Sequence, residues 1–418
     1  MVMELGKMVV LLALLCIASR IGVVNGKRSI PSQGKEPEVE KKLKSLNKPF
    51  IKSIKSGDGD IIDCVDIKKQ PAFDHPLMKN HVIKKFPRIP RTGATSPVPP
   101  RLNSSMPFSQ VWRRSGSCPA GTIPIRRVLK YHLLNASSLA RYGMKNSGMV
   151  MKRGFRIHGH TFALGLENNH SVVVLHIGGS NFLGAKAYIN VWNPPVEADD
   201  EYTTGQIWLK NGPVDNSDTI EVGWMVNPSV YGDRQTRLFI YWTADSGKST
   251  GCFDLLCSGF IQMNRDVVLG GTITPMSSFH GLQSYISLEV FKDPKQDAWW
   301  LIFNTNIVIG YWPSKIFNHM QNTAGTLQWG GDVYSPRMHT GGTATGMGSS
   351  HFAFEHWSMA SFIAQPRMMT TSMAYEYPKS STVVAPEMKC YAGEIYSEGS
   401  GEEPLFYFGG PGLNMFCP

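Results

Sequence analysis

The feature that most constrains the fold is a series of short apolar segments in the second half of the chain. From about Val172 onward, each segment is rich in β-branched and aromatic residues, and Gly, Pro, Asn or Asp residues separate it from the next. This pattern is typical of β-strands joined by turns. The segments are VVVLHIG, AKAYINVW, GQIWLK, TIEVGWMV, RLFIYWT, FIQMN, YISLEVF, WWLIF, IVIGYWP, TLQWGGDVY and PLFYFGG.

These segments predict an all-β domain, most simply an antiparallel β-sandwich. The longest helical pattern that we expect among them lies near residues 351–365. The chain has 418 residues, of which 42% are hydrophobic, so it can form one large or two medium domains with a substantial core.

The first 26 residues differ from the rest. Lys7 precedes the short apolar run MVVLLALLCIA, and the small residues Asn25 and Gly26 follow it. The run is too short to span a bilayer and is typical of a cleaved secretory signal peptide. We therefore expect a secreted protein with no membrane anchor after signal cleavage.

The cysteines agree with a secreted protein. Cys16 leaves with the signal, and an even number, six, remains. Six cysteines in an oxidising compartment favour three disulfides. Proximity in the sequence favours the pairs Cys252–Cys257 and Cys390–Cys417, which leaves Cys64–Cys118.

Metal binding is the alternative use of cysteine and histidine. The sequence has no CxxC or HExxH motif, and the two histidines of HGH (residues 158–160) have no further ligands near them in the sequence. We expect no metal and no cofactor. Sequons at Asn103, Asn135 and Asn169 would permit N-glycosylation of a secreted chain.

Charge divides the chain after the signal. Residues 27–165 carry 27 basic and 8 acidic residues, a net charge of +19, whereas residues 166–418 carry 13 and 23, a net charge of −10. A basic segment alone is typical of nucleic-acid or anionic-membrane binding. Here the acidic partner is in the same chain, so we expect no nucleic acid. We expect the basic, partly irregular, proline-rich segment to cover an acidic domain.

Two carboxylates stand in similar strand patterns. In TIEVGW, Ile220, Val222 and Trp224 share one face, and Glu221 lies on the other. In LQWGGDVYS, Asp332 likewise lies opposite the large apolar residues.

A glycine stands two positions from each acid, Gly223 beside Glu221 and Gly330 beside Asp332, and we expect both to leave open space. Two carboxylates in a groove can hydrolyse a bond, one acting as base and one as acid. The alternative is that both acids are solvated residues on an exposed face, which pattern alone favours.

Longer stretches of the sequence resemble the plant neprosin family, secreted glutamic endopeptidases with a basic activation segment. The similarity covers nearly everything after the signal. In the first part the matching stretches are DCVDIKKQPAFDHPLMKNH and CPAGTIPIRR. In the second they are TIEVGWMVNP, YGDRQTRLFIYWTAD, STGCFDLLCSGFIQ, WWLIF, VIGYWP, QWGGDVY, GMGSSHF and FYFGGPG.

The resemblance implies a signal peptide (1–26), an activation segment (27–165) and a β-sandwich catalytic domain (166–418). It also implies cleavage of peptide bonds at acidic pH, after proline in the founding member, by two glutamates. One glutamate falls on Glu221. At the other position the sequence has Asp332, whose side chain is shorter by one carbon–carbon bond, about 1.5 Å.

From this we predict a glutamic-type peptidase made as a zymogen, in which Glu221 and Asp332 activate a water molecule. Tyr241, Trp242, Trp329 and Tyr334 are candidates for lining the substrate subsites. We expect Glu355, in the stretch HFAFEHW, to be structural.

The expected partners are a peptide or protein substrate and the chain's own pro segment, in a monomer located in the apoplast or the vacuole. An alternative is a catalytically impaired member that binds peptides or cell-wall material, which the Asp332 departure favours. A third interpretation, a lectin-like sandwich, has only the fold and the 10 tryptophans in its favour.

Overall fold

The computed structural model describes residues 36–90, 109–145, 151–157, 160–166 and 169–417, so the expected signal peptide lies outside the described residues. The chain divides into two compact units, Met1–Glu38 and Val39–Pro418. Only three residues of the first unit are described, so the fold is that of the second unit. Within the described ranges, no helix is both long enough and apolar enough to cross a membrane.

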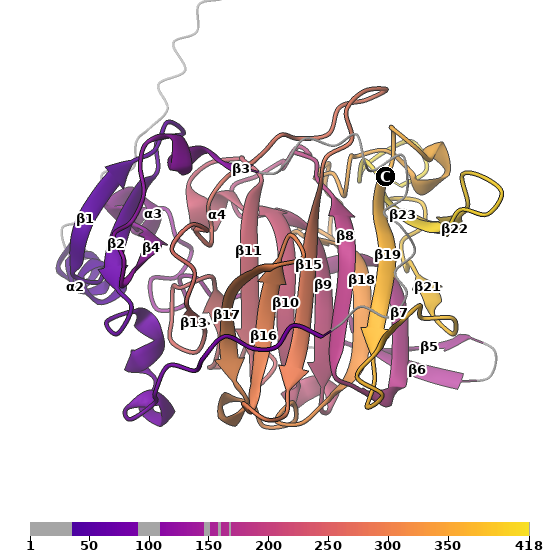
Figure 1. Cartoon of the computed structure of the whole chain (residues 1–418). Helices are drawn as coiled ribbons and strands as arrows, with labels where there is room; N and C mark the ends of the chain where they lie inside the picture. The colour runs from indigo at the N-terminus through magenta and orange to yellow at the C-terminus, as the bar shows by residue number, and fades with distance from the viewer. Residues whose placement is uncertain (1–35, 91–108, 146–150, 158–159, 167–168, 418) are drawn as a thin grey trace, which may run out of the picture. The chain divides into compact units, whose positions relative to one another are not determined.

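Two large antiparallel sheets form the second unit (Figure 1). The seven-stranded sheet has the order β12 (Cys252–Phe253), β11 (Arg237–Thr243), β10 (Asp218–Val226), β9 (Tyr202–Asn211), β18 (Ala324–Tyr334), β7 (His170–Phe182) and β21 (Thr382–Val384). The nine-stranded sheet has the order β13 (Ile261–Gln262), β17 (Ile307–Pro313), β16 (Ala298–Phe303), β15 (Tyr285–Asp293), β8 (Gly184–Asn190), β19 (Ser361–Met369), β23 (Leu405–Gly409) and β22 (Ala392–Tyr396), with β20 (Tyr375–Glu376) paired to β19.

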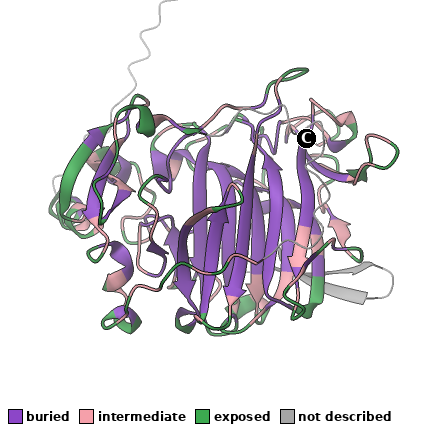
Figure 2. Ribbon diagram, in the orientation of Figure 1, coloured by how far each residue is buried: buried purple, intermediate pink, exposed green. Residues whose placement is uncertain are grey.

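The apolar faces of the two sheets meet in one core. On β10, Ile220, Val222 and Trp224 point into this core, as the alternation of the sequence predicts. The Trp224 indole N–H donates to the carbonyl of Asn190 in the opposite sheet at 2.9 Å. The all-β sandwich predicted from the sequence is therefore confirmed. Unlike a sheet with one solvated face, the central strands are buried on both faces (Figure 2).

The basic segment has its own small elements. They are α2 (Glu36–Leu46), the three-stranded sheet β1 (Phe50–Lys55), β2 (Ile61–Asp66) and β4 (Thr122–Arg126), and α3 (Lys130–Leu134). Strand β3 (Ser109–Gln110) pairs with β14 (Ile273–Thr274), and β5 (Met151–Ile157) pairs with β6 (His160–Leu166). The described residues also form these short helices: η1 (Pro71–Asp74), η2 (Pro76–Met78), η4 (Val111–Arg114), η5 (Val214–Asn216), α4 (Pro228–Tyr231), η6 (Ser314–Ile316) and η7 (Ala353–Glu355).

The helical pattern expected near residues 351–365 is wrong. That stretch contains only the one-turn η7, and from Ser361 the chain continues as β19. The strand pattern is hard to see because a bulge lies between Ala364 and Arg367, where Gln365 has a φ of 47°. An extra residue at a bulge shifts the side chains that follow it out of the two-residue alternation.

The three disulfides have the pairing expected from sequence proximity. They are Cys64–Cys118 in the basic segment, and Cys252–Cys257 and Cys390–Cys417 in the sandwich.

A buried ion pair joins the basic segment to the sandwich. The guanidinium of Arg237, on β11, is fully buried and donates to Asp60 Oδ2 at 2.6 Å and to Asp233 Oδ2 at 2.5 Å. Arg126 of β4 donates to the other oxygen of Asp60 at 2.8 Å. At this pair the acid comes from the basic segment and the base from the acidic domain, opposite to what the net charges suggest.

We predict that Asp60→Asn destabilises the full-length protein. The change leaves the buried Arg237 guanidinium with one carboxylate fewer, and loss of one partner of a buried pair costs about 3–5 kcal/mol. Urea unfolding of the full-length chain at neutral pH measures the loss.

The matched control for this prediction is Asp74→Asn. Asp74 pairs with Lys48 in the same segment, and its side chain is 58% exposed. The control should cost no more than about 1 kcal/mol. Equal losses in the two variants would contradict the structural role assigned to Asp60.

Candidate active site

Glu221 lies in the middle of β10, on the face of the seven-stranded sheet that points away from the sandwich core. Its side chain is nevertheless only 3% exposed. The carboxylate oxygen Oε2 accepts one hydrogen bond from the ammonium of Lys145 at 2.5 Å and one from the amide of Gln206 at 2.6 Å. Glu221 is thus a buried carboxylate whose cation comes from the basic segment.

Asp332 lies on β18 and is equally buried, with 2% of the residue exposed. Nδ1 of His170 is 3.0 Å from each of the two carboxylate oxygens. Carboxylate oxygens only accept hydrogen bonds when ionised, so the imidazole carries the proton on Nδ1 and donates it. His170 begins β7, the strand next to β18.

The two acids share one face of the sheet, with β9 between their strands. Glu221 is opposite Trp208 of β9, and Asp332 is opposite Thr204. Gln206 lies midway between these two positions, and its side-chain oxygen is buried without a hydrogen-bond partner among the described residues. Gln206 therefore lies between the two carboxylates on this face of the sheet.

Lys145 acts on both acids. Besides the bond to Glu221, its ammonium lies 5.0 Å from the centre of the Tyr241 ring. Burial opposes the ionisation of Asp332, but His170, and after it Lys145, outweigh burial and lower the pKa of Asp332 below its ordinary value. Asp332 is consequently held as an anion in the full-length chain.

The glycines beside the acids do not leave open space, contrary to the expectation from the sequence. A Cβ on Gly223 would collide with the backbone of Gly205 and with Cβ of Gln206. A Cβ on Gly330 would collide with the backbone of Val173. The glycines instead permit close packing of neighbouring strands, and Gly223 makes room for Gln206.

Two of the four predicted subsite residues lie on the face of the acids. Tyr241 is opposite Glu221 on β11 and packs on Phe253 at a ring-centroid distance of 5.1 Å. Tyr334 stacks on Tyr202 at 5.2 Å. These rings belong to an apolar cluster on this face, which also contains Met225, Val230, Tyr231 and Phe239.

The other two predicted subsite residues lie on the opposite face. Trp242 and Trp329 belong to the core between the sheets, and Trp329 is fully buried there. The prediction that they line subsites does not fit this placement. The reason is the two-residue period of a strand, which puts each of them on the side away from the acids.

Residues 136–145 of the basic segment lie against the face of the acids. The backbone N–H of Phe253 donates to the carbonyl of Gly143 at 2.7 Å, and the hydroxyl of Tyr142 donates to the carbonyl of Val230 at 2.8 Å. Arg141 donates to the carbonyls of the loop at residues 247–248.

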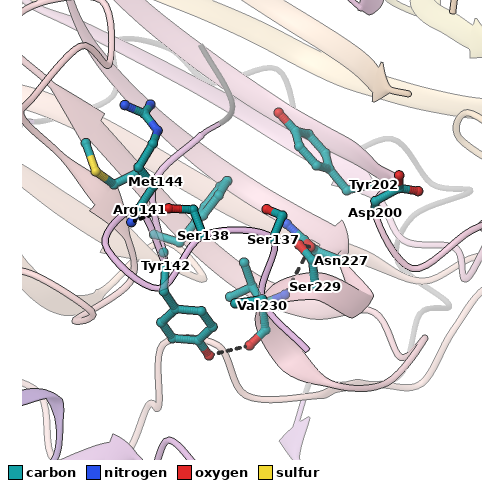
Figure 3. Close-up of a pocket in the computed structure, with 13 residues that line it drawn as sticks. Ser137, Ser138, Arg141, Tyr142, Met144, Asp200, Tyr202, Asn227, Ser229 and Val230 are labelled. Carbon is teal, nitrogen blue, oxygen red and sulfur yellow. Dashed lines mark hydrogen bonds between the residues drawn. The ribbon is translucent and has the colours of Figure 1, made fainter. Parts of the chain in front are cut away.

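Figure 3 shows a small cavity that is lined by Ser137, Tyr142 and Met144 of this stretch and by Tyr202 and Val230 of the sandwich. The cavity holds about 30 Å³, room for water rather than for a peptide. In the full-length chain the activation segment therefore fills the surface beside the acids.

The remaining candidate residues lie elsewhere. Glu355 accepts the backbone N–H of Phe352 at 2.9 Å and lies 2.7 Å from Nδ1 of His351, contacts that hold a turn. Of the sequons, Asn135 is exposed and Asn169 is half-buried, whereas Asn103 lies outside the described residues.

Three residues of this site were missed by the sequence analysis: Lys145, Gln206 and His170. Only Gln206 had a usable signal, because it is a polar residue at the start of the apolar strand segment GQIWLK. The described part of the chain contains no cluster of three or more His, Cys, Asp or Glu side chains that could hold a metal ion.

Comparison with solved structures finds distant likenesses to two peptidases. Scytalido-glutamic peptidase bound to a peptide-based transition-state analogue is 9% identical, with coverage of 58% of this chain and 98% of that one and a TM-score of 0.32. SCP-B, a member of the eqolisin family in complex with the tripeptide Ala-Ile-His, is 8% identical, with the same coverage and a TM-score of 0.31.

A lectin gives a weaker likeness. CG-16, a homodimeric agglutinin from chicken liver, is 5% identical, with coverage of 39% of this chain and 92% of that one and a TM-score of 0.21. Likenesses at these TM-scores support no conclusion about function.

The family models are decisive. The model of the neprosin activation peptide matches residues 53–166, and the neprosin model matches residues 199–411, just over half of the 418 residues. The chain therefore belongs to the neprosin family of glutamic-type peptidases and carries the family's activation peptide ahead of its catalytic domain.

Proposed function

We propose that this chain is a secreted acid endopeptidase of the glutamic type that uses Glu221 and Asp332 to hydrolyse peptide bonds. Bonds after proline are the first candidates, because the family resemblance implies them. We place the boundary between activation segment and catalytic domain near residues 165–166.

One observation carries the proposal. Two buried carboxylates lie on the same face of one sheet, and a lysine of the activation peptide is bonded to one of them. A buried carboxylate needs a partner, and a structural one usually finds it within its own domain. Glu221 instead takes its cation from the segment that a zymogen discards.

The chemistry needs no covalent intermediate. Once the segment has left, a water molecule can bind to one of the acids. One carboxylate takes a proton from the water as the oxygen attacks the peptide carbonyl, and the other gives a proton to the leaving amine. Tyr241 and Tyr334, with Tyr202 between them on the same face, are the residues that we propose for substrate contact.

Acid is the proposed trigger of activation. The lowered pKa of Asp332 means that its ionised form stabilises the full-length fold. That stabilisation is complete above the ordinary aspartate pKa of about 3.9 and is lost as the pH falls through the lowered value. Protonation of Asp332 removes its part of the attraction for Lys145 and so weakens the hold on residues 136–145.

The presence of Asp332, where the family resemblance implies a glutamate, supports a second candidate function. Its arm is about 1.5 Å shorter than that of glutamate, and it is bonded to His170. A misplacement of about 1 Å can lower a rate roughly a hundredfold. A catalytically impaired member would bind peptides on the same face without cleaving them.

The first prediction for this site concerns cleavage. Acid-treated full-length protein should cut a quenched, proline-containing peptide library at about pH 3. The isosteric variants Glu221→Gln and Asp332→Asn should lower kcat at least about a hundredfold, because each removes an acid or base. Glu355→Gln, which changes a structural carboxylate, is the matched control and should keep its activity.

Two results would contradict the proposed peptidase function. Equal rates for wild type and Glu221→Gln would exclude Glu221 from the chemistry. Cleavage by Asp332→Glu alone, with wild type inactive, would favour the impaired binding protein.

A further prediction concerns Lys145. Lys145→Met should destabilise the full-length protein by about 3–5 kcal/mol at neutral pH, because it leaves the buried Glu221 without its cation. At neutral pH, trypsin should also cut after Arg141 faster than in wild type.

Lys130→Met is the control for Lys145→Met. Lys130 lies in the same segment, 3.5 Å from Glu40, and the two side chains are 41% and 52% exposed. Its loss should cost no more than about 1 kcal/mol. If the two lysine variants behave alike, Lys145 has no special role in latency.

A further inference from the structure

We propose that His170 is a positioning residue of this active site, which fixes Asp332 as the base and thereby leaves Glu221 as the acid. The inference rests on the proposed function and assigns the two carboxylates different roles within it.

The geometry of the pair is that of a fixed donor. Nδ1 of His170 lies 3.0 Å from both Oδ1 and Oδ2 of Asp332, so the imidazole faces the middle of the carboxylate. Neither residue is more than 4% exposed. The ring lies 5.0 Å from Tyr334 and 5.8 Å from Tyr202, measured between centroids, and these rings limit its rotation.

The pair leaves Asp332 with unused acceptor sites for a water molecule. An ionised carboxylate has about four acceptor sites, and one N–H donor occupies only part of them. Asp332 can therefore accept a proton from water while His170 keeps its hydrogen bond to the carboxylate. Because aspartate has a short arm, a fixed orientation matters more here than it would for a flexible glutamate.

His170 also stays when the activation segment goes. Three basic groups lower the pKa of Asp332: His170, Lys145 and Lys210. In turn the charge of Asp332, after burial and other acidic groups, contributes to the raised pKa of Tyr391. Lys145 lies in the activation peptide and departs with it, whereas His170 lies beyond the residues that match that peptide.

His170, the largest of the influences that lower the pKa of Asp332, therefore persists in the mature enzyme. A carboxyl with a lowered pKa remains a base at lower pH, which is what an acid peptidase needs.

Glu221, in contrast to Asp332, loses its cationic partner when the activation segment leaves. Its ammonium partner departs, and Gln206 remains as a neutral donor. In the cleavage step, Asp332 takes the water proton, the water oxygen bonds to the carbonyl carbon, and the carbon–nitrogen bond breaks as Glu221 protonates the nitrogen. Loss of a proton from Asp332 and its uptake by Glu221, both through solvent, restore the starting state.

Two substitutions separate the hydrogen bond from the charge. His170→Asn can place an amide N–H where Nδ1 lies but cannot be protonated, and His170→Phe keeps a ring of similar shape without any donor. The measurement is kcat and KM for the best library peptide as a function of pH, on acid-treated full-length protein.

The expected result has three parts. In both variants the acid limb of the kcat profile moves to higher pH, because Asp332 protonates more readily. At the optimum, kcat falls roughly tenfold to a hundredfold in His170→Phe and less in His170→Asn. KM changes little in either variant.

The control is His351→Asn, which alters another histidine–carboxylate pair, 2.7 Å from Glu355, and should leave the profile unchanged. If His170→Phe fails to fold, the acid limb of His170→Asn decides the question alone. Wild-type cleavage with an unmoved acid limb in the His170 variants overturns only this inference. No cleavage by wild type overturns the proposed function itself.

Discussion

The ion pair between Lys145 and Glu221 is the interaction on which the rest of the site depends. Both side chains are almost completely buried, and a carboxylate in such a place is costly unless a cation neutralises it. The sheet can keep Glu221 beside aromatic rings because residues 136–145 bring an ammonium to it. The activation segment thus neutralises a charge of the site as well as covering it. When the segment departs, water, substrate or a proton must replace its ammonium group at Glu221.

The two acids depend on different parts of the chain. Glu221 takes its cation from the activation peptide, whereas Asp332 takes its partner, His170, from β7 of the sandwich. Net charge does not reveal this. The charges of +19 and −10 suggest a basic cover on an acidic domain, yet the buried pair Asp60–Arg237 runs in the opposite sense. Exposed charges are screened by salt, so a few buried pairs, not the totals, determine how the segment is held.

The sequence predicted the sheet and the face of the acids because both follow from the two-residue period. Ile220, Val222 and Trp224 define the core side of β10, so Glu221 must lie on the other side. The same rule, applied to Trp242 and Trp329, would have placed them in the core. Strand β19 was missed because its bulge at Gln365 interrupts the period. Lys145 and His170 could not be predicted, because only the tertiary fold brings them to Glu221 and Asp332.

The most direct test follows the full-length chain by mass spectrometry during incubation at about pH 3, below the ordinary carboxyl pKa values. If the carboxylate pair is the catalyst that the activation segment guards, the wild-type chain loses that segment over time. Under the same conditions Glu221→Gln, which should lack the acid but keep the fold, remains intact. Loss of the segment at the same rate in both proteins, in the absence of any added protease, would contradict the account.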